Sequence, residues 1–101
     1  MSKIQEIFNY SDPNKVYKNA IKIYGKDTII LISSRKDKKY SIYDPYNNKF
    51  INFGQMGYED YQKHKCEYRR LNYLKRSNNI KGKWKDNIYS PNNLSINLLW
   101  N

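Results

Sequence analysis

The chain has 101 residues and a net charge of +10, with 19 Lys and Arg against nine Asp and Glu. This length fits one domain, which we assign to residues 1–101. Eleven tyrosines favour a folded state despite the charge, because each aromatic ring can bury a large apolar area. One cysteine and one histidine exclude an internal disulfide and a four-ligand zinc site. We therefore expect no cofactor.

The apolar residues form no long uninterrupted run. None approaches the about 20 residues that a membrane-spanning helix needs, and the first 15 residues lack the apolar core of a signal peptide. We therefore expect no membrane association and no secretion.

Residues 1–10 carry Ile4, Ile7 and Phe8 without a recognisable cap, and we predict a flexible tail or a short docking segment there. The next stretch has clear helix signals. Asp12 or Ser11 can cap, Pro13 suits the first helical position, and Gly25 can end the helix. The spacing predicts a helix over residues 13–24.

Three β-branched and aromatic runs follow, "TIILIS" (28–33), "KYSIYD" (39–44) and "KFINFG" (49–54). The first has the length of a buried strand, and the turn-forming residues 44–48 separate the other two. We predict an α+β fold with a three-stranded antiparallel sheet, one face of which is covered by the helix over residues 13–24.

Helical spacing returns after Gly57 and predicts one long basic helix over residues 58–77. At 100° per residue, one arc of this helix would be its packed face: it contains Tyr58, Tyr61, His64, Tyr68, Leu71 and Leu74. A separate stripe along the flank contains Lys65, Arg69, Asn72 and Arg76.

The C-terminal part begins with a basic linker over residues 77–87. Residues 87–101 then carry no charged side chain but include Leu94, Ile96, Leu98, Leu99 and Trp100. An exposed cluster of this kind would promote aggregation, so we expect the segment to dock on the core or on a partner.

The positive charge is concentrated between residues 63 and 85, where nine Lys and Arg face one acid. Clustered cations favour phosphate binding because neutralised phosphates release counterions, and nearby aromatic rings can stack on unpaired bases. The sequence therefore predicts a nucleic-acid interface made of Lys63, Lys65, Arg69, Arg70, Tyr73, Arg76, Lys81, Lys83, Trp84 and Lys85. A solvated basic face and an acidic protein partner are the alternatives, and for each of the two aromatic rings taken singly packing is favoured over stacking.

No motif of a known sequence-reading domain is present, so we expect weak sequence specificity.

Catalysis has little support, and we favour a non-enzyme: His64 falls on the packed arc and is expected to be structural. The enzyme alternative is a small metal-dependent nuclease that uses Asp44, Glu59 or Asp60. A third alternative is a structural protein that binds another protein, or a second copy of itself, through its uncharged C-terminal segment.

Four strings carry a family resemblance over residues 14–101: "RKDKKY" (35–40), "FGQMGYEDYQKHK" (53–65), "RRLNYLKR" (69–76) and "YSPNNLSINLLW" (89–100). The chain resembles a family of small, functionally uncharacterised proteins of giant nucleocytoplasmic DNA viruses, including mimivirus relatives. The resemblance implies a viral source and a location in the virion or the host-cell cytoplasm. Of the two nucleic acids, we expect DNA rather than RNA as the partner. In that family the position of Cys66 is often acidic, which implies no thiol chemistry.

Overall fold

The computed structural model describes residues 2–101 and contains one three-stranded antiparallel sheet. Its strands follow the chain in the order β1 (Ile30–Ile32), β2 (Lys38–Asp44) and β3 (Lys49–Gln55). Ile42 in the central strand pairs with Ile30 on one side and with Ile51 on the other. The predicted α+β class and the predicted sheet are confirmed.

Helix α2 (Pro13–Tyr24) has the predicted bounds. The Asp12 carboxylate accepts hydrogen bonds from the backbone N–H groups of Asn14 and Lys15, which satisfies donors that have no partner inside the helix. Val16 and Ala20 are fully buried, so the apolar side of the helix covers the sheet as predicted.

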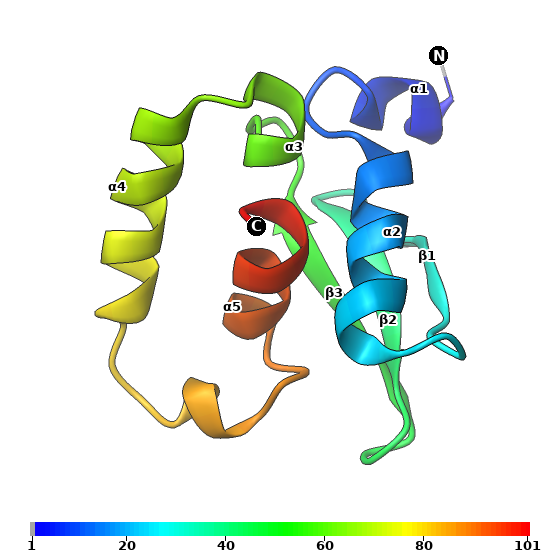
Figure 1. Cartoon of the computed structure of the whole chain (residues 1–101). Helices are drawn as coiled ribbons and strands as arrows, with labels where there is room; N and C mark the ends of the chain where they lie inside the picture. Colours follow the sequence, from blue (N-terminus) through cyan, green and yellow to red (C-terminus); the bar gives the residue numbers. More distant parts are fainter. Residues whose placement is uncertain (1) are drawn as a thin grey trace.

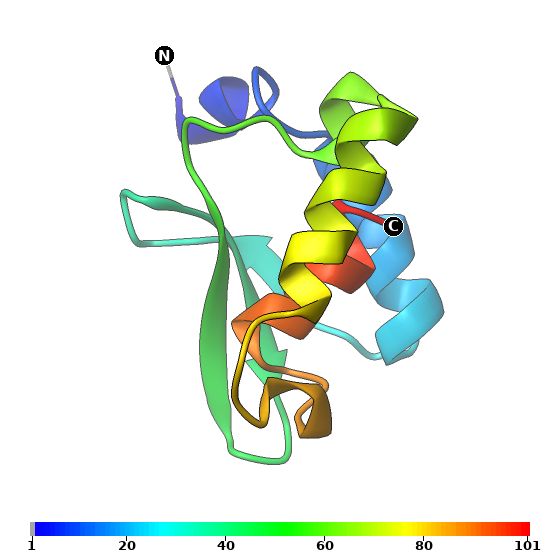
Figure 2. The same cartoon turned by 90° about the vertical axis from the view of Figure 1, so that its left-hand side faces the viewer.

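The C-terminal segment forms a second helical element beside α2 (Figure 1). It consists of α5 (Pro91–Leu94), capped by Ser90, and a π-helical turn, η2 (Ser95–Leu99). Leu94, Leu98 and Leu99 are at most 1% exposed. Figure 2 shows that the two helical elements lie over the same face of the sheet. The predicted docking of this segment therefore takes place on the chain's own core.

The N-terminal residues are ordered into α1 (Lys3–Ile7). Ser2 caps this helix in a reciprocal arrangement with Gln5, a cap that the sequence analysis did not recognise. Ile7 is fully buried in the core, and the Lys3 ammonium donates to the carbonyl of Ser33 at 2.6 Å. Residues 2–7 thus close one end of the core.

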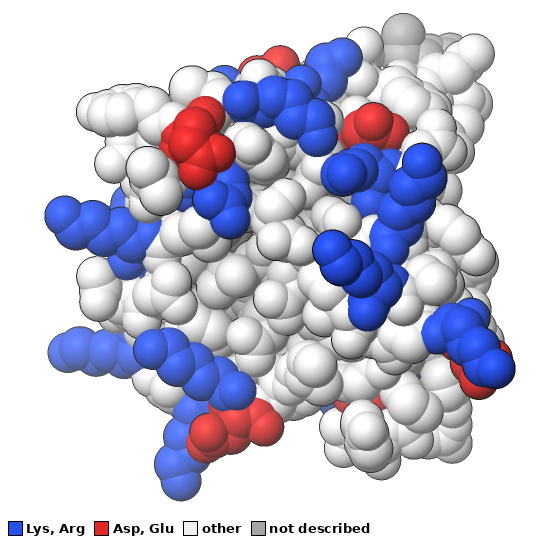
Figure 3. Space-filling model, viewed as in Figure 1, with Lys and Arg blue, Asp and Glu red and all other residues white. Residues whose placement is uncertain are grey.

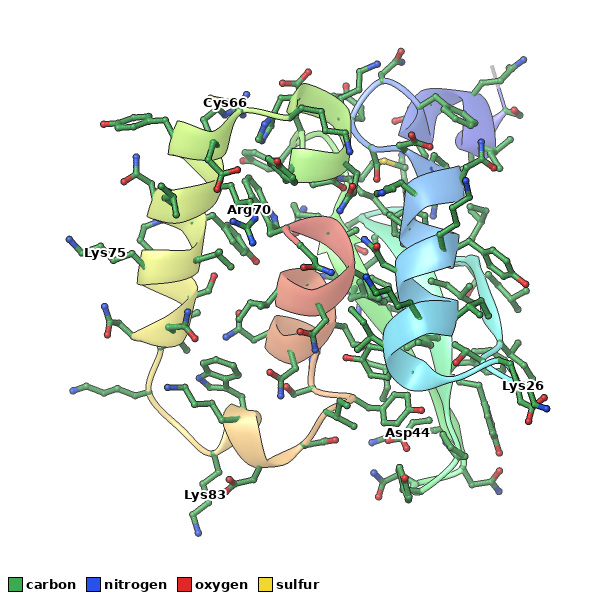
Figure 4. All side chains as sticks on the ribbon, in the orientation of Figure 1. Lys26, Asp44, Cys66, Arg70, Lys75 and Lys83 are labelled. Atoms are coloured by element: carbon green, nitrogen blue, oxygen red, sulfur yellow. The ribbon has the colours of Figure 1, made fainter. Side chains whose placement is uncertain are left out.

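The prediction of one helix over residues 58–77 is wrong. The chain forms α3 (Tyr61–His64) and α4 (Glu67–Asn78), separated by Lys65 in a left-handed conformation with φ of 54° and by Cys66 at the start of α4 (Figure 4). The break rotates the two helices relative to each other, so the predicted packed arc does not exist. Three of its members are exposed: Tyr58 by 70%, Tyr68 by 76% and Leu71 by 57%.

The prediction that the first strand is buried is also wrong. β1 has three residues and lies at the edge of the sheet, so it has a neighbouring strand on one side alone. Leu31 in this strand is 53% exposed. A short edge strand limits pairing with other chains.

Candidate nucleic-acid interface

Seven of the nine basic side chains between residues 63 and 85 are exposed and form no ion pair with a carboxylate within residues 2–101. We call these seven residues the basic face: Lys63, Lys65, Lys75, Arg76, Lys81, Lys83 and Lys85. They come from α3, from the break after α3, from α4 and from the connection that ends in the short 3-10 helix η1 (Trp84–Asp86). Their charges are therefore accessible to a ligand.

Basic side chains follow α4 and the connection after it along one side of the molecule (Figure 3). The uncharged C-terminal segment separates them from a second group of lysines over α2, which includes Lys15, Lys18 and Lys22. Lys75 and Lys83 point away from the fold (Figure 4). Nucleic-acid phosphates could thus reach them without displacing protein groups.

Two of the predicted site residues are engaged inside the protein. Arg70 points toward the C-terminal segment, where its Nε donates to the carbonyl of Trp100 at 2.8 Å, and it also pairs with Glu67 at 2.9 Å. Arg69 pairs with Glu59 at 3.1 Å, but both side chains remain accessible. Arg70 therefore holds the C-terminus in place, and Arg69 is available only in competition with a carboxylate.

The two predicted stacking residues are both packed. The Tyr73 ring lies parallel to the Trp100 ring, with centroids 4.1 Å apart and an interplanar angle of 8°. Trp84 is half-buried, and its Nε1 donates to the carbonyl of Ile80 at 2.8 Å. The exposed rings near the basic residues are those of Tyr58 and Tyr68. Helical spacing had indicated packing for both rings, so neither was expected to contact a ligand.

A groove of about 500 Å³ separates α4 from the loop that follows β3, and Figure 2 shows these two elements facing each other. Arg69, Asn72 and Arg76 form one wall, so three members of the predicted flanking stripe do share a surface. The fourth member, Lys65, lies in the helix break outside the groove and donates to the Gln62 side chain at 2.9 Å. The opposite wall includes Glu59, whose pair with Arg69 bridges the groove.

Lys39 and Asp60, two further residues of the groove lining, have buried side chains. Burial raises the pKa of Asp60, and the charge of Lys39 partly offsets this effect. Burial likewise lowers the pKa of Lys39, partly offset by the charge of Asp60. The pair therefore serves as a structural link in the groove lining and contributes no net charge to the groove.

His64 is held by its neighbours. Its Nδ1 accepts a hydrogen bond of 2.9 Å from the backbone N–H of Cys66, and its ring centroid lies 5.2 Å from that of Trp100. Burial, together with the positive charge of Arg69, lowers the pKa of His64. A neutral ring that accepts from the backbone just before α4 fits the structural role expected for it.

The three acids considered for a nuclease site are not brought together. Asp44 lies at the start of the turn before β3 (Figure 4), whereas Glu59 and Asp60 follow the other end of that strand, which spans about 20 Å at 3.3 Å per residue. Burial raises the pKa of Asp44, but hydrogen bonds from Asn47 and Tyr46 outweigh this effect and lower it overall. Within residues 2–101, no three His, Cys, Asp or Glu side chains are arranged to hold a metal ion.

No helix in residues 2–101 is both long enough and apolar enough to cross a membrane. The fold and the surface together define a small α+β protein with an accessible basic face beside a polar groove.

Over residues 29–77, from the start of the sheet almost to the end of α4, the chain is similar to a family of unknown function (DUF5754). No curated protein and no solved structure matches the chain. The resemblance to giant-virus proteins remains a prediction.

Proposed function

We propose that the protein binds nucleic acid, with weak sequence specificity, through its basic face. The observation that carries this proposal is the accessibility of seven cationic side chains that have no carboxylate partner within the described part of the chain. Cations held apart from carboxylates keep their full attraction for phosphates, and each phosphate contact releases condensed counterions. Phosphate contacts carry little sequence information.

The exposed ring of Tyr68 favours a single-stranded ligand. Tyr68 is 76% exposed on α4, in the same helix as two members of the basic face, Lys75 and Arg76. A base is free to stack on such a ring only when it is unpaired. The expected viral source favours DNA as the partner and the virion or the host-cell cytoplasm as the place of action.

The C-terminal segment gives less support to the structural alternative. Leu98 and Leu99, which would have to contact another protein, are at most 1% exposed because they pack in this chain's own core. Docking of a partner on these residues would require the core to open.

Binding can be measured by fluorescence anisotropy with a labelled 20-nucleotide single-stranded DNA, the matched RNA and the matched duplex, each at several salt concentrations. The test variant is Lys63→Ala/Lys75→Ala/Lys81→Ala. The control, Lys15→Ala/Lys18→Ala/Lys22→Ala, removes the same charge from exposed positions on α2. Each phosphate contact with a single strand contributes about 0.7 to the slope of log affinity against log salt concentration. If all three test lysines contact phosphates, the magnitude of this slope should therefore decrease by about 2. The control should retain most of the affinity.

Equal losses of affinity in the two triple variants would show that net charge alone attracts the ligand, and the basic face would then not be the site.

Polyglutamate serves as a competitor that carries charge without bases. If it displaces DNA at the same charge concentration, an acidic protein becomes the better partner and the proposal fails.

A further inference from the structure

The groove beside α4 carries several polar side chains that have no hydrogen-bond partner within residues 2–101. Asn72 and Arg76 project from α4, and Gln55 lies on the opposite wall at the end of β3. Tyr58, whose ring is 70% exposed, stands at the same wall. The groove therefore offers amide, guanidinium and aromatic groups to one bound molecule.

These groups match the parts of a nucleotide. The carboxamide of Asn or Gln can form two hydrogen bonds with the edge of adenine, donating to a ring nitrogen and accepting from the amino group. A tyrosine ring can stack on the base, and a guanidinium can take two phosphate oxygens. The volume of about 500 Å³ lies within the range of about 300 to 1,000 Å³ typical of small-molecule sites.

The spacing of the groups along α4 suits one nucleotide. Arg76 follows Asn72 by four residues, so the two side chains share a side of the helix and are separated by about 6 Å along its axis. A base held by Asn72 would thus have its own phosphate within reach of the long Arg76 side chain.

The charges of the groove indicate how many phosphates it can take. The Lys39 and Asp60 charges offset each other, and Arg69 is paired with Glu59, so Arg76 contributes the free positive charge. A phosphate near Arg69 would have to replace the Glu59 carboxylate, which satisfies the same guanidinium geometry. One phosphate is therefore favoured over a chain of two or three.

We propose that this groove binds one unpaired nucleotide, with adenine as the preferred base. In this site Asn72 and Gln55 hydrogen-bond the base edge, Tyr58 stacks on the base, and Arg76 binds the phosphate. The proposal rests on the proposed function: the basic face holds the strand, and the groove takes one of its bases.

The test is a titration of the whole ¹⁵N-labelled chain with adenosine 5′-monophosphate, followed by NMR. Signals of Gly54, Gln55, Tyr58, Asn72 and Arg76 should shift together and saturate, and adenosine and inorganic phosphate should each bind more weakly. Asn72→Ala should lower the affinity at least about fivefold, the lower end of what a two-bond base contact contributes. Asn14→Ala, an exposed asparagine on α2, is the matched control and should not change it.

Two further variants separate the roles within the site. Tyr58→Ala should weaken the binding of the monophosphate, whereas Tyr46→Ala, which removes an exposed ring outside the groove lining, should leave it unchanged. Arg76→Ala should reduce the affinity for the monophosphate to that for adenosine. The dispersion of the NMR signals reports whether each variant is folded.

Three outcomes would overturn the proposal. Inorganic phosphate that shifts the same signals as strongly as the nucleotide would make the groove a simple anion site. Equal affinities of Asn72→Ala and Asn14→Ala would remove the base contact. If labelled DNA binds but the monophosphate does not shift the groove signals, this inference fails while the proposed function stands; if neither ligand binds, both fail.

Discussion

Lys39 and Asp60 form an ion pair in which each side chain is 2% exposed and Nζ lies 3.2 Å from Oδ2. The Lys39 ammonium also donates to the carbonyl of Tyr58 at 2.6 Å, and the backbone N–H of Asp60 donates to the carbonyl of Tyr10 at 2.9 Å. Strand β2, the connection between α1 and α2, and the start of α3 are thus joined at one point. This junction fixes the loop that forms a wall of the groove.

Replacing one member of this pair should be far more costly than replacing both. Lys39→Met or Asp60→Leu leaves a partner without its counter-charge, and each should lower the free energy of unfolding by about 3 to 5 kcal/mol. In Lys39→Met/Asp60→Leu no charge remains buried, so its loss should be smaller than the sum of the single losses. Urea unfolding of the four proteins measures the difference, and strict additivity would show that the two side chains are not coupled.

Stability should fall at alkaline pH through Tyr24. Burial raises the pKa of Tyr24 to about 12, partly opposed by a hydrogen bond from Asn97. The folded state therefore keeps the phenol proton at a pH at which the unfolded chain has already lost it. The stability linked to this group is fully present below pH 10 and is lost as the pH rises toward 12. Tyr24→Phe should flatten the decrease in thermal stability between these two pH values, and an unchanged profile would contradict the assignment.

Gly54 should tolerate alanine less well than Gly25. Both have positive φ, 83° and 110°, so both variants carry backbone strain of about 1 to 3 kcal/mol. At Gly54, however, a Cβ would lie 3.1 Å from Leu99 Cδ1 and 3.3 Å from Lys39 Cβ, whereas at Gly25 it would meet nothing within 4 Å. Overpacking should therefore add about 1 to 3 kcal/mol to Gly54→Ala alone. Equal midpoints in urea would show that the neighbours move aside freely.

Two side chains of the C-terminal segment should differ in their contribution to stability. Leu98 is fully buried, and Leu98→Ala should cost about 2 to 5 kcal/mol. Trp100 is partly exposed and packs through one face on Tyr73, so Trp100→Ala should cost about 2 kcal/mol, less than the 3 to 5 of a fully buried ring. Thermal unfolding followed by circular dichroism would rank them, and a larger loss for Trp100→Ala would reverse this assignment.

Local chemistry was sufficient to predict much of the fold. Helix α2 depends on Asp12, Pro13 and Gly25, whose capping and backbone preferences act over a few residues. The turn after Asp44 and the cap at Ser90 have the same local origin. The docking of the C-terminal segment was predictable because a run of apolar residues without charges gains free energy when it leaves water.

The candidate site was predictable only in part. The charge cluster and the shared side of Arg69, Asn72 and Arg76 follow from sequence spacing along what became α4. The sequence did not show which aromatic rings stay exposed. Position 65, where the helix breaks, holds a lysine and not the glycine or proline that would signal a break. Tyr73 and Tyr68 both lie on α4, yet Tyr73 meets a ring from the C-terminus and Tyr68 is 76% exposed.

The amino-acid sequence by itself determined the class of fold, the N-terminal cap and C-terminal end of α2, the hairpin and the concentration of positive charge, since these depend on neighbours along the chain. Only the tertiary structure decided where the predicted long helix breaks. Gln62 donates to the carbonyls of Leu98 and Asn101, and Asp60 is held by Lys39, so α3 is tied to distant residues and cannot run straight into α4. Contacts between segments far apart in sequence outweighed the helical preference of residues 58–77, because the burial and hydrogen bonds they supply exceed the about 1 to 2 kcal/mol cost of a left-handed residue.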